Sequence, residues 1–394
     1  MASADLVIGV IGAGAMGSGI AQLAAAAGHR VVLGDLNASA VARAKAAISK
    51  ALARDVEKGR LDDAGASELL ARIEDAGDLS HDYSAFAECG LVIEAILEDL
   101  AAKRTLFRAL EVVVRSDCVL ATNTSSLSVS AIAGGCARAE RVVGIHFFNP
   151  ATVMPLVEIV PGLATGASVL ERAVALVKGW KKTTVVASDT PGFIVNRIAR
   201  PFYSESLRQL DEGVADVATI DWAMREVGGF RMGPFELMDF IGNDVNYAVT
   251  TSVYDAFYQD SRYRPSMTQR RLVDAGWYGR KSGRGYYDYR DGAERPEPTR
   301  NEALAGEIVD RTMAMLVNAA ADALYMGVAS ADDIELAMTK GVNYPKGLLA
   351  WGDEIGAATI LERLKSLQRE YGEERYRPSP LLRARVRDGV GLAS

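Results

Sequence analysis

The three histidines are the first residues to consider for acid–base chemistry, since imidazole is the side chain that most readily moves a proton near neutral pH. His29 and His81 lie in predicted polar turns, and we expect both to be surface residues. His146 follows the apolar run Val142–Ile145 and so stands at the carboxyl end of a predicted strand. Ligands bind at this edge of open α/β sheets, so any imidazole chemistry is expected at His146.

Glu158 is the candidate partner of His146. It lies inside the apolar run Leu156–Val160, where a buried carboxylate is costly unless another group pairs with it. A pair with His146 would fix the imidazole tautomer and raise its basicity, as a general base requires. The alternatives are a core histidine at position 146 and an exposed glutamate on an edge strand at position 158.

Ser125 and Asn196 are two further candidates for contact with a substrate. Ser125 follows the predicted strand Cys118–Thr122 and can supply a hydroxyl at the same sheet edge, or it can cap the helix that follows. Asn196 lies in Pro191–Arg197, where the sequence pattern changes from mixed to helical. Clefts of two-domain enzymes often form at such a junction.

A glycine-rich loop lies between the predicted strand Leu6–Ile11 and the predicted helix Ser18–Ala27, and Asp35 ends the next strand. In this context a GxGxxG loop predicts a dinucleotide site at the helix N-terminus, with an acidic residue on the adenosine ribose. Leu36 and Asn37 carry no positive charge for a 2′-phosphate, which favours NAD over NADP. The alternative is a glycine-rich turn without a ligand. The predicted cofactor residues of the loop are Gly12, Ala13, Gly14, Ala15, Met16 and Gly17.

Alternating strand and helix patterns predict an α/β Rossmann-like domain over residues 1–188, with a largely parallel sheet and helices on both faces. Residues 38–76 read as a helical hairpin that projects from it. Residues 189–290 are predicted to form an all-α domain, followed by a linker at Arg290–Asn301.

Residues 303–394 are predicted to be a degenerate repeat of the helical domain. The segment Arg262–Ser266 recurs as Arg375–Ser379. Further positions match in order at a constant separation: Gly213, Ile220, Ala223, Met224, Gly233, Asp239, Ile241 and Gly242 with Gly327, Ile334, Ala337, Met338, Gly347, Asp353, Ile355 and Gly356.

Composition excludes several classes of function. The formal charge of −7 gives no basic field, so we expect no nucleic-acid partner. Three scattered cysteines and three histidines provide neither a disulfide framework nor a metal site. The stretch from Leu6 to His29 has no charged residue, but its glycines argue against a membrane span or signal peptide. We expect a cytoplasmic protein.

As a set, these motifs resemble those of the NAD-dependent L-3-hydroxyacyl-CoA dehydrogenases. The resemblance runs from about residue 5 to residue 290 and implies NAD-dependent, reversible oxidation of (S)-3-hydroxyacyl-CoA to 3-oxoacyl-CoA. The region Phe230–Ser266 looks most similar to enzymes for short-chain and 3-hydroxyadipyl-CoA substrates, including those of phenylacetate catabolism. The matching segments are Gly12–Gly17, Asn123–Leu127, His146–Pro150, Asp189–Arg197, Met232–Leu237 and Gly279–Tyr287.

The resemblance also implies roles for single residues. His146 and Glu158 match the catalytic histidine and its carboxylate partner, and Ser125 and Asn196 match contacts to the 3-oxygen and thioester region of the substrate. Lys58 matches a lysine that reaches the CoA phosphates, although Ala51 replaces a neighbouring serine of that site. The positions that match NAD contacts are Glu98, Lys103, Ser125, Asn149 and Lys281.

Two other functions remain open from the sequence: a related NAD-dependent dehydrogenase of a small hydroxy acid or carnitine, and a non-catalytic NAD- or CoA-binding subunit. Two-domain members of the family that this chain resembles dimerise through the helical domain. The second copy is therefore predicted to make the chain a monomer with an intrachain pseudo-dimer, the alternative being a homodimer. Asp310 replaces Asn196 in this copy, which also lacks a segment like Gly279–Tyr287, so no second active site is expected.

Overall fold

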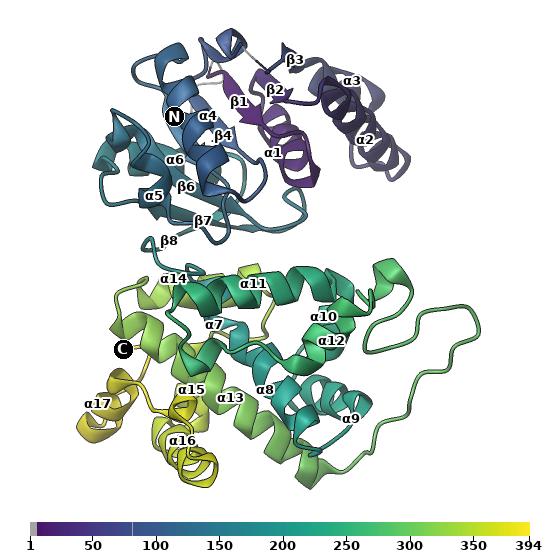
Figure 1. Cartoon of the computed structure of the whole chain (residues 1–394), viewed down its shortest axis with the longest axis vertical. Coiled ribbons are helices and arrows are strands. Elements are labelled where there is room, and N and C mark those ends of the chain that lie inside the picture. The colour runs from purple at the N-terminus through teal and green to yellow at the C-terminus, as the bar shows by residue number, and fades with distance from the viewer. Residues whose placement is uncertain (1–5, 81) are drawn as a thin grey trace. The chain divides into compact units, whose positions relative to one another are not determined.

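The computed structural model describes residues 6–80 and 82–394, so the prediction for His81 lies outside the described residues. The chain divides into two compact units, Met1–Thr190 and Pro191–Ser394 (Figure 1). The first is a Rossmann-like α/β unit and the second is helical, which confirms the predicted fold class at this level.

The N-terminal unit is built on an eight-stranded sheet in the order β3-β2-β1-β4-β5-β6-β7-β8. All neighbouring strands are parallel except β6 and β7, which are antiparallel. The central strands are apolar runs buried on both faces, as expected for a parallel sheet. The strands are β1 (Ile8–Ile11), β2 (Val31–Asp35), β3 (Ile73–Asp78), β4 (Leu91–Glu94), β5 (Val119–Thr122), β6 (Val142–Phe147), β7 (Leu156–Pro161) and β8 (Thr183–Val186).

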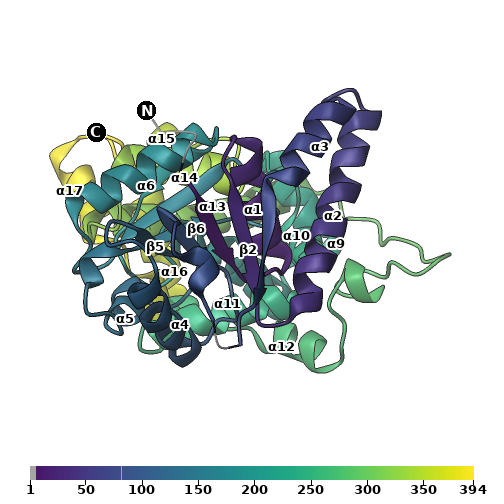
Figure 2. The same cartoon turned by 90° about the horizontal axis from the view of Figure 1, so that it is seen from above.

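Helices connect the strands and bury their apolar faces against the sheet. One core combines alternate strand residues such as Val10 and Ile145 with α1, α2, α3 and α6. Figure 2 shows α2 and α3 side by side as a helical arm. The helices of this unit are α1 (Ala15–Ala26), α2 (Ala38–Glu57), α3 (Asp63–Ala71), α4 (Leu100–Val113), α5 (Val129–Ala133) and α6 (Ala167–Gly179).

Two predictions for this unit are wrong in part. The helical hairpin ends at Ala71, because Ile73–Asp78 forms the edge strand β3. Only Ile73 of this strand is buried, so the sequence carries no apolar run that would mark it. His29 is buried rather than on the surface, because its Nδ1 lies 3.1 Å from the Leu6 carbonyl and its ring packs near Trp180. Burial lowers the pKa of His29.

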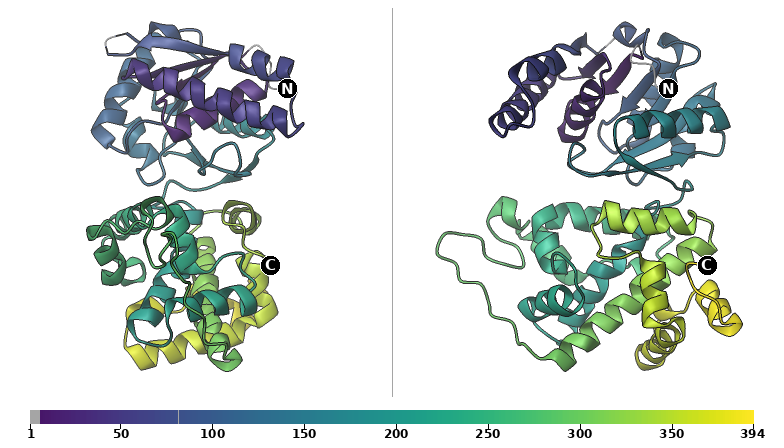
Figure 3. Two further views of the ribbon diagram at one scale, coloured as in Figure 1. Left: turned by 90° about the vertical axis from the view of Figure 1, so that its right-hand side faces the viewer. Right: turned by 180° about the vertical axis from the view of Figure 1, so that it is seen from behind.

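The C-terminal unit consists of helices and short turns. Its longest helix, α13, packs against α8 from the first half and against α15, α16 and α17 from the second half (Figure 3). The helices are α7 (Val195–Ile198), α8 (Arg200–Asp211), α9 (Val217–Trp222), α10 (Pro234–Ile241), α11 (Asn243–Ala256), α12 (Met267–Asp274), α13 (Glu302–Tyr325), α14 (Ala331–Gly341), α15 (Leu348–Ile355), α16 (Ala357–Tyr371) and α17 (Pro380–Asp388). Short 3-10 turns used below are η4 (Ser261–Tyr263), η5 (Arg280–Ser282) and η6 (Glu374–Tyr376).

Residues 290–301 form no helix or strand and connect the two halves of this unit, as the sequence predicts for a linker. Pro296 and Pro298 cannot donate a backbone hydrogen bond, which disfavours regular structure there. Across the described residues of both units, none of the helices has the length and apolar character needed to cross a membrane.

Candidate active site

The loop after β1 has the geometry of a phosphate-binding turn. Gly12 has a φ of +104°, and a Cβ on it would lie 2.4 Å from the Ala95 carbonyl oxygen, so only glycine fits. A Cβ on Gly17 would lie 1.7 Å from the Gly12 carbonyl oxygen. A Cβ on Gly14 would meet nothing within 4 Å, so this side of the loop is open to a close ligand. The loop and the start of α1 therefore fit a pyrophosphate.

Asp35 ends β2 beside this loop. Its Oδ2 accepts a hydrogen bond of 2.7 Å from the Ala13 amide, and its Oδ1 accepts one of 2.9 Å from the Asn37 amide. The carboxylate thus ties the glycine-rich loop to the end of the second strand. Its half-exposed position matches that expected for a group that binds ribose hydroxyls.

His146 and Glu158 face each other across the antiparallel pair β6 and β7, where they are direct register partners. The His146 Nδ1 lies 2.7 Å from the Glu158 Oε2. Glu158 is fully buried and β7 lies between two other strands, so the alternative of an exposed edge-strand glutamate is wrong. The His146 ring also packs against Phe148, with 4.6 Å between ring centroids. The arrangement can hold one imidazole tautomer and stabilise its protonated form.

Ser125 lies in a turn after β5 that is held close to His146. The Asn123 Oδ1 accepts a hydrogen bond of 2.9 Å from the Phe147 amide, which joins this turn to the end of β6. The N-cap of α5 is Ser128, so the alternative role of Ser125 as the helix cap is wrong. Ser125 is only partly buried and follows the carboxyl end of β5.

Glu98 organises the same turn from the neighbouring loop. Its Oε1 accepts hydrogen bonds from the Thr124 hydroxyl at 2.6 Å and the Ser125 amide at 3.0 Å, and Ser126 adds two more. Burial opposes ionisation of Glu98, but Lys103 and these donors outweigh it, and the pKa of the carboxyl is lowered. Glu98 therefore stays charged and positions the Ser125 turn.

Lys103 is almost completely buried between two carboxylates. Its Nζ lies 2.5 Å from the Glu94 Oε1 and 3.2 Å from the Glu98 Oε2. Sequence reasoning missed Glu94, which ends β4 and also accepts a hydrogen bond from the Thr122 hydroxyl at 2.7 Å. A carboxylate at the end of an apolar strand, nine residues before a lysine, is the signal that could have found it.

Of the remaining predicted residues, two lie on the N-terminal unit and two on the helical unit. Asn149 is exposed just after β6, and Lys58 is exposed at the C-cap of α2. Asn196 lies on α7 of the helical unit and is partly exposed. Lys281 lies on η5, where its Nζ is 2.6 Å from the Asp244 Oδ1.

Two buried carboxylates brace the segment that carries Lys281. Asp239 accepts hydrogen bonds of 3.0 Å from the amides of Tyr286 and Tyr287, and Asp221 accepts one of 2.7 Å from the Tyr287 hydroxyl. Burial raises the pKa of Asp221 to about 7, against the hydrogen bonds that favour its charged form. Sequence reasoning gave neither aspartate this role.

The described residues include no group of three or more His, Cys, Asp or Glu side chains arranged to hold a metal ion.

Comparison with known proteins gives the same assignment over nearly the whole chain. Residues 7–190 match the model of the 3-hydroxyacyl-CoA dehydrogenase NAD-binding domain. Residues 192–289 and, separately, 306–392 match that of the 3-hydroxyacyl-CoA dehydrogenase C-terminal domain. A 3-hydroxyadipyl-CoA dehydrogenase of Escherichia coli K12 is 41% identical over 96% of this chain and 97% of its own. A 3-hydroxybutyryl-CoA dehydrogenase of Bradyrhizobium diazoefficiens is 42% identical over 76% of this chain and 100% of its own.

Solved structures agree. The crystal structure of a 3-hydroxybutyryl-CoA dehydrogenase from Escherichia coli K12 matches with a TM-score of 0.91 and 40% identity, covering 98% of this chain and 99% of the other. A (S)-3-hydroxybutyryl-CoA dehydrogenase from Ralstonia eutropha matches with a TM-score of 0.68 and 38% identity, covering 72% of this chain and 99% of the other. The chain is an NAD-dependent oxidoreductase that belongs to the 3-hydroxyacyl-CoA dehydrogenase family.

Proposed function

We propose that this enzyme oxidises (S)-3-hydroxyacyl-CoA to 3-oxoacyl-CoA reversibly, with His146 and Glu158 as its acid–base pair. The observation that carries the proposal is the buried contact of 2.7 Å between these two side chains. The pair lies on the same sheet in which the Gly12–Gly17 loop follows β1, and β1 and β6 run in the same direction. An imidazole base and a nucleotide loop at one sheet edge suit hydride transfer from an alcohol.

His146 takes the proton of the 3-hydroxyl group in this mechanism. In this mechanism the Nδ1–H of His146 donates to the ionised Glu158 carboxylate, and Nε2 is the ring nitrogen that takes the substrate proton. Glu158 then stabilises the imidazolium that forms. Bound NAD supplies the acceptor for the hydride that leaves C3. In the reverse direction the imidazolium returns the proton to the 3-oxygen.

Ser125 and Asn196 hold the reacting part of the substrate in this proposal. The Ser125 hydroxyl donates to the 3-oxygen from the turn that Glu98 fixes, and Asn196 contacts the thioester region from the helical unit. Positioning of this kind lowers the entropy cost of reaching the transition state. The residues proposed to hold NAD are those of the Gly12–Gly17 loop with Asp35, Glu98, Lys103, Ser125, Asn149 and Lys281.

The acyl group is carried by CoA, and Lys58 is proposed to contact the CoA phosphates. Lys58 lies at the C-cap of α2, and its side chain is exposed. An exposed lysine can contact a phosphate group of a bound ligand. The relatives named for 3-hydroxybutyryl-CoA and 3-hydroxyadipyl-CoA support a short-chain or six-carbon dicarboxylyl substrate.

The test is a spectrophotometric assay of NADH consumption with acetoacetyl-CoA. Wild-type enzyme is expected to turn over, and His146→Gln is expected to lose turnover by orders of magnitude while NADH affinity stays near wild type. His29→Gln serves as the matched control, because His29 contacts a backbone carbonyl away from the site. Unchanged turnover in His146→Gln would remove that residue from the mechanism. Activity on free 3-hydroxy acids or carnitine but not on the thioester would favour the related dehydrogenase.

We also propose that residues 303–394 are a degenerate copy of the helical domain 189–290 and that the two form an intrachain pseudo-dimer. Matched carboxylates support the duplication. Asp221 accepts hydrogen bonds from two consecutive amides in the first turn of α10, and Glu335 does the same in the first turn of α15. Asp239 and Asp353 each accept hydrogen bonds from two consecutive amides near the C-terminal end of their half: Tyr286 and Tyr287 for Asp239, and Leu392 and Ala393 for Asp353.

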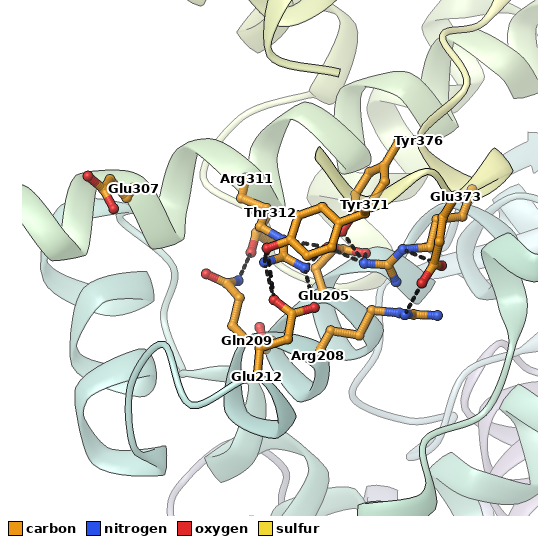
Figure 4. Close-up of polar contacts among 12 residues, drawn as sticks. Glu205, Arg208, Gln209, Glu212, Glu307, Arg311, Thr312, Tyr371, Glu373 and Tyr376 are labelled. Atoms are coloured by element: carbon orange, nitrogen blue, oxygen red, sulfur yellow. Dashed lines mark hydrogen bonds and ion pairs between the residues drawn. The ribbon is translucent and has the colours of Figure 1, made fainter. Parts of the chain in front are cut away.

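Ion pairs between the halves support the pseudo-dimer. Glu205 on α8 is fully buried and pairs with Arg311 at 3.0 Å (Figure 4). It also pairs with Arg375 at 2.9 Å. In the corresponding arrangement, Asp322 on α13 pairs with Arg262 at 2.8 Å and with Arg197 at 3.5 Å. Each half thus offers two arginines to a carboxylate of the other half.

Light scattering at several concentrations tests this proposal. A monomer at micromolar concentration is the expected result, because the second copy covers the face of α8 that a partner chain would use. A stable dimer whose interface includes α8 would contradict it.

A further inference from the structure

A cavity in the helical unit lies where its two halves meet, and charged and aromatic residues line it. Its volume is about 550 Å³, which is within the range of small-molecule sites. The first half contributes residues of α7, η4 and the segment after α11, and the second half contributes residues of α13, α16, η6 and α17. Among the described residues that line it, none is proposed above to hold NAD or the substrate. The cavity therefore belongs to no site described so far.

Arg197 places a buried guanidinium at the wall of this cavity. The residue is only 4% exposed, and its guanidinium lies 4.9 Å from the centre of the Phe257 ring. Its one ion pair with a described residue is a contact of 3.5 Å between Nη2 and the Asp322 Oδ2. No acceptor in the described part of the chain takes a hydrogen bond from the Arg197 side chain. The protein therefore leaves the donors of this cation unsatisfied.

Arg262 is a second arginine of the cavity wall and uses the same carboxylate. Its Nη1 donates a hydrogen bond of 2.8 Å to the Asp322 Oδ2, the oxygen that Arg197 also approaches. Its side chain is 9% exposed, and its buried Nε has no hydrogen-bond partner within the described residues. Two buried guanidinium groups thus share one carboxylate, which leaves one positive charge without a counter-charge.

Arg311, the arginine of the second half that matches Arg197 in the proposed duplication, is fully compensated. Its guanidinium also lies over an aromatic ring, that of Tyr371, at 4.8 Å from the ring centre. All three of its nitrogens donate hydrogen bonds, which go to the carboxylates of Glu205 and Glu212 and to two tyrosine hydroxyls (Figure 4). The same kind of cation is therefore satisfied by the protein in one half and not in the other.

Two residue differences between the halves account for the missing acceptors at the cavity. At the constant separation by which we relate the halves, Phe257 matches Tyr371 and Met326 matches Glu212. Phe257 keeps a ring beside the guanidinium but has no hydroxyl, and Met326 has no carboxylate. Both residues line the cavity, so open space stands where Arg197 lacks these acceptors.

The rest of the lining adds positive charge and apolar surface. Arg383 on α17 is exposed and makes no ion pair with a described residue. Tyr325 and Met326, at the end of α13, are large and more than half exposed. The whole lining has four arginines and three carboxylates, which gives it a net charge of +1. Guanidinium groups bind planar and tetrahedral oxyanions best, so the matching ligand has an oxyanion and an apolar part.

We propose that this cavity binds a small organic oxyanion, a carboxylate or a phosphate ester with an apolar or aromatic group attached. The oxyanion accepts hydrogen bonds from the Arg197 guanidinium and supplies the negative charge that Asp322 alone does not provide for Arg197 and Arg262. The attached group packs against Tyr325 and Met326. No bond is made or broken. The site goes beyond the proposed function and does not depend on it.

The test is calorimetric titration of the full chain with phenyl phosphate, benzoate and phenol in the presence of saturating NAD, which keeps the probes out of the dinucleotide site. The three probes share an aromatic ring, and phenol lacks the oxyanion. Phenyl phosphate, benzoate or both are expected to bind with a dissociation constant below about 1 mM. Phenol is expected to bind at least about 10-fold more weakly, because it makes no charge-assisted hydrogen bond. The tighter of the two anions identifies the oxyanion that the cavity prefers.

Substitutions in the lining should change the anion affinity in opposite directions. Arg197→Gln removes the central donor and is expected to weaken binding at least about 10-fold. Asp322→Asn removes the carboxylate that competes with the ligand for both arginines and is expected to tighten binding about 10-fold. Arg383→Gln removes an exposed cation of the lining and is expected to weaken binding about 3-fold. The matched control is Arg387→Gln, an exposed arginine of the same helix that does not line the cavity, which should leave the affinity at the wild-type value.

Failure of both anions to bind wild type at about 10 mM, or binding of phenol as tight as that of the anions, would overturn the proposal. An anion affinity that stays the same in Arg197→Gln, or that does not rise in Asp322→Asn, would show that the anion binds elsewhere and would overturn it as well. Where neither of these variants folds, Arg383→Gln decides, and a wild-type affinity in that variant overturns the proposal. The readout is binding alone, so it stands apart from any result on turnover.

Discussion

Glu158→Gln tests how much the buried carboxylate contributes to catalysis. The change keeps the size and an acceptor oxygen for the His146 Nδ1–H but removes the negative charge. Because both side chains are nearly or fully buried, solvent screens their interaction little. The substitution should therefore leave the ground state almost unchanged and raise the energy of the state in which His146 is protonated.

The contact distance sets the magnitude of this effect. A separation of 2.7 Å between Nδ1 and Oε2 is that of a charge-assisted hydrogen bond. With the charge centres about 4 Å apart and an effective dielectric constant of about 20, the ion pair contributes about 4 kcal/mol. The amide of glutamine retains a neutral hydrogen bond of about 1 kcal/mol. The net loss of about 3 kcal/mol corresponds to a fall in kcat of about 100-fold.

The assay is kcat for acetoacetyl-CoA reduction, followed by NADH absorbance at saturating substrate. NADH affinity from fluorescence titration and the melting temperature should stay close to wild type, which separates a catalytic effect from misfolding. Glu140→Gln is the matched control, since Glu140 is an exposed glutamate whose carboxylate pairs with Arg138. A fall in kcat of less than 3-fold in Glu158→Gln, with NADH affinity and melting temperature close to wild type, would refute the role of the carboxylate.

Three more outcomes follow from the same contacts. Asp35→Ala should weaken NAD binding at least 10-fold, because the loop loses the acceptor for the Ala13 amide as well as the ribose contact. An NADH dissociation constant equal to that of wild type would exclude a contribution of either contact to binding. Glu205→Leu should lower the free energy of unfolding of the helical unit in urea by about 3 kcal/mol, because Arg375 then retains only its ion pair with the half-buried Glu373 among the described residues. Glu362→Gln, a change at an exposed glutamate, should leave that free energy unchanged. Burial raises the pKa of Asp221 to about 7, so the folded state binds this proton more tightly than the unfolded state and stability falls as pH rises from about 4 to about 7. Asp221→Asn should flatten this dependence of the melting temperature, and an identical slope in wild type and variant would rule out Asp221 as its source.

The sequence predicts the central sheet well because its strands are buried on both faces. Such strands are continuous apolar runs, as β1, β4 and β5 are. The edge strand β3 has one buried residue, so no pattern distinguishes it from the end of a helix. His29 escapes prediction for a related reason, because its partner is the Leu6 carbonyl, and backbone acceptors leave no mark in the sequence.

Some candidate site residues can likewise be predicted from a local sequence pattern, and others cannot. His146 and Glu158 could be found because each is a polar residue in an apolar run, where burial demands a partner. Glu98 could not be assigned its positioning role from the sequence, because its hydrogen-bond donors lie 26 to 28 residues further along the chain. Its role depends on two loops that only the parallel order of β4 and β5 brings together.

Residues 303–394, the proposed second helical copy, are best explained by the surface that they offer to residues 189–290. It keeps the carboxylates that brace its own helices, Glu335 and Asp353, yet it has Asp310 where the first copy has Asn196. A copy kept for chemistry would retain that asparagine, and one kept only as a spacer would not need buried arginines. Instead it supplies Arg311 and Arg375 to Glu205. In the proposed pseudo-dimer, the cover over α8 comes from the same chain, so a substitution in one half leaves the other half unchanged and the two halves can diverge.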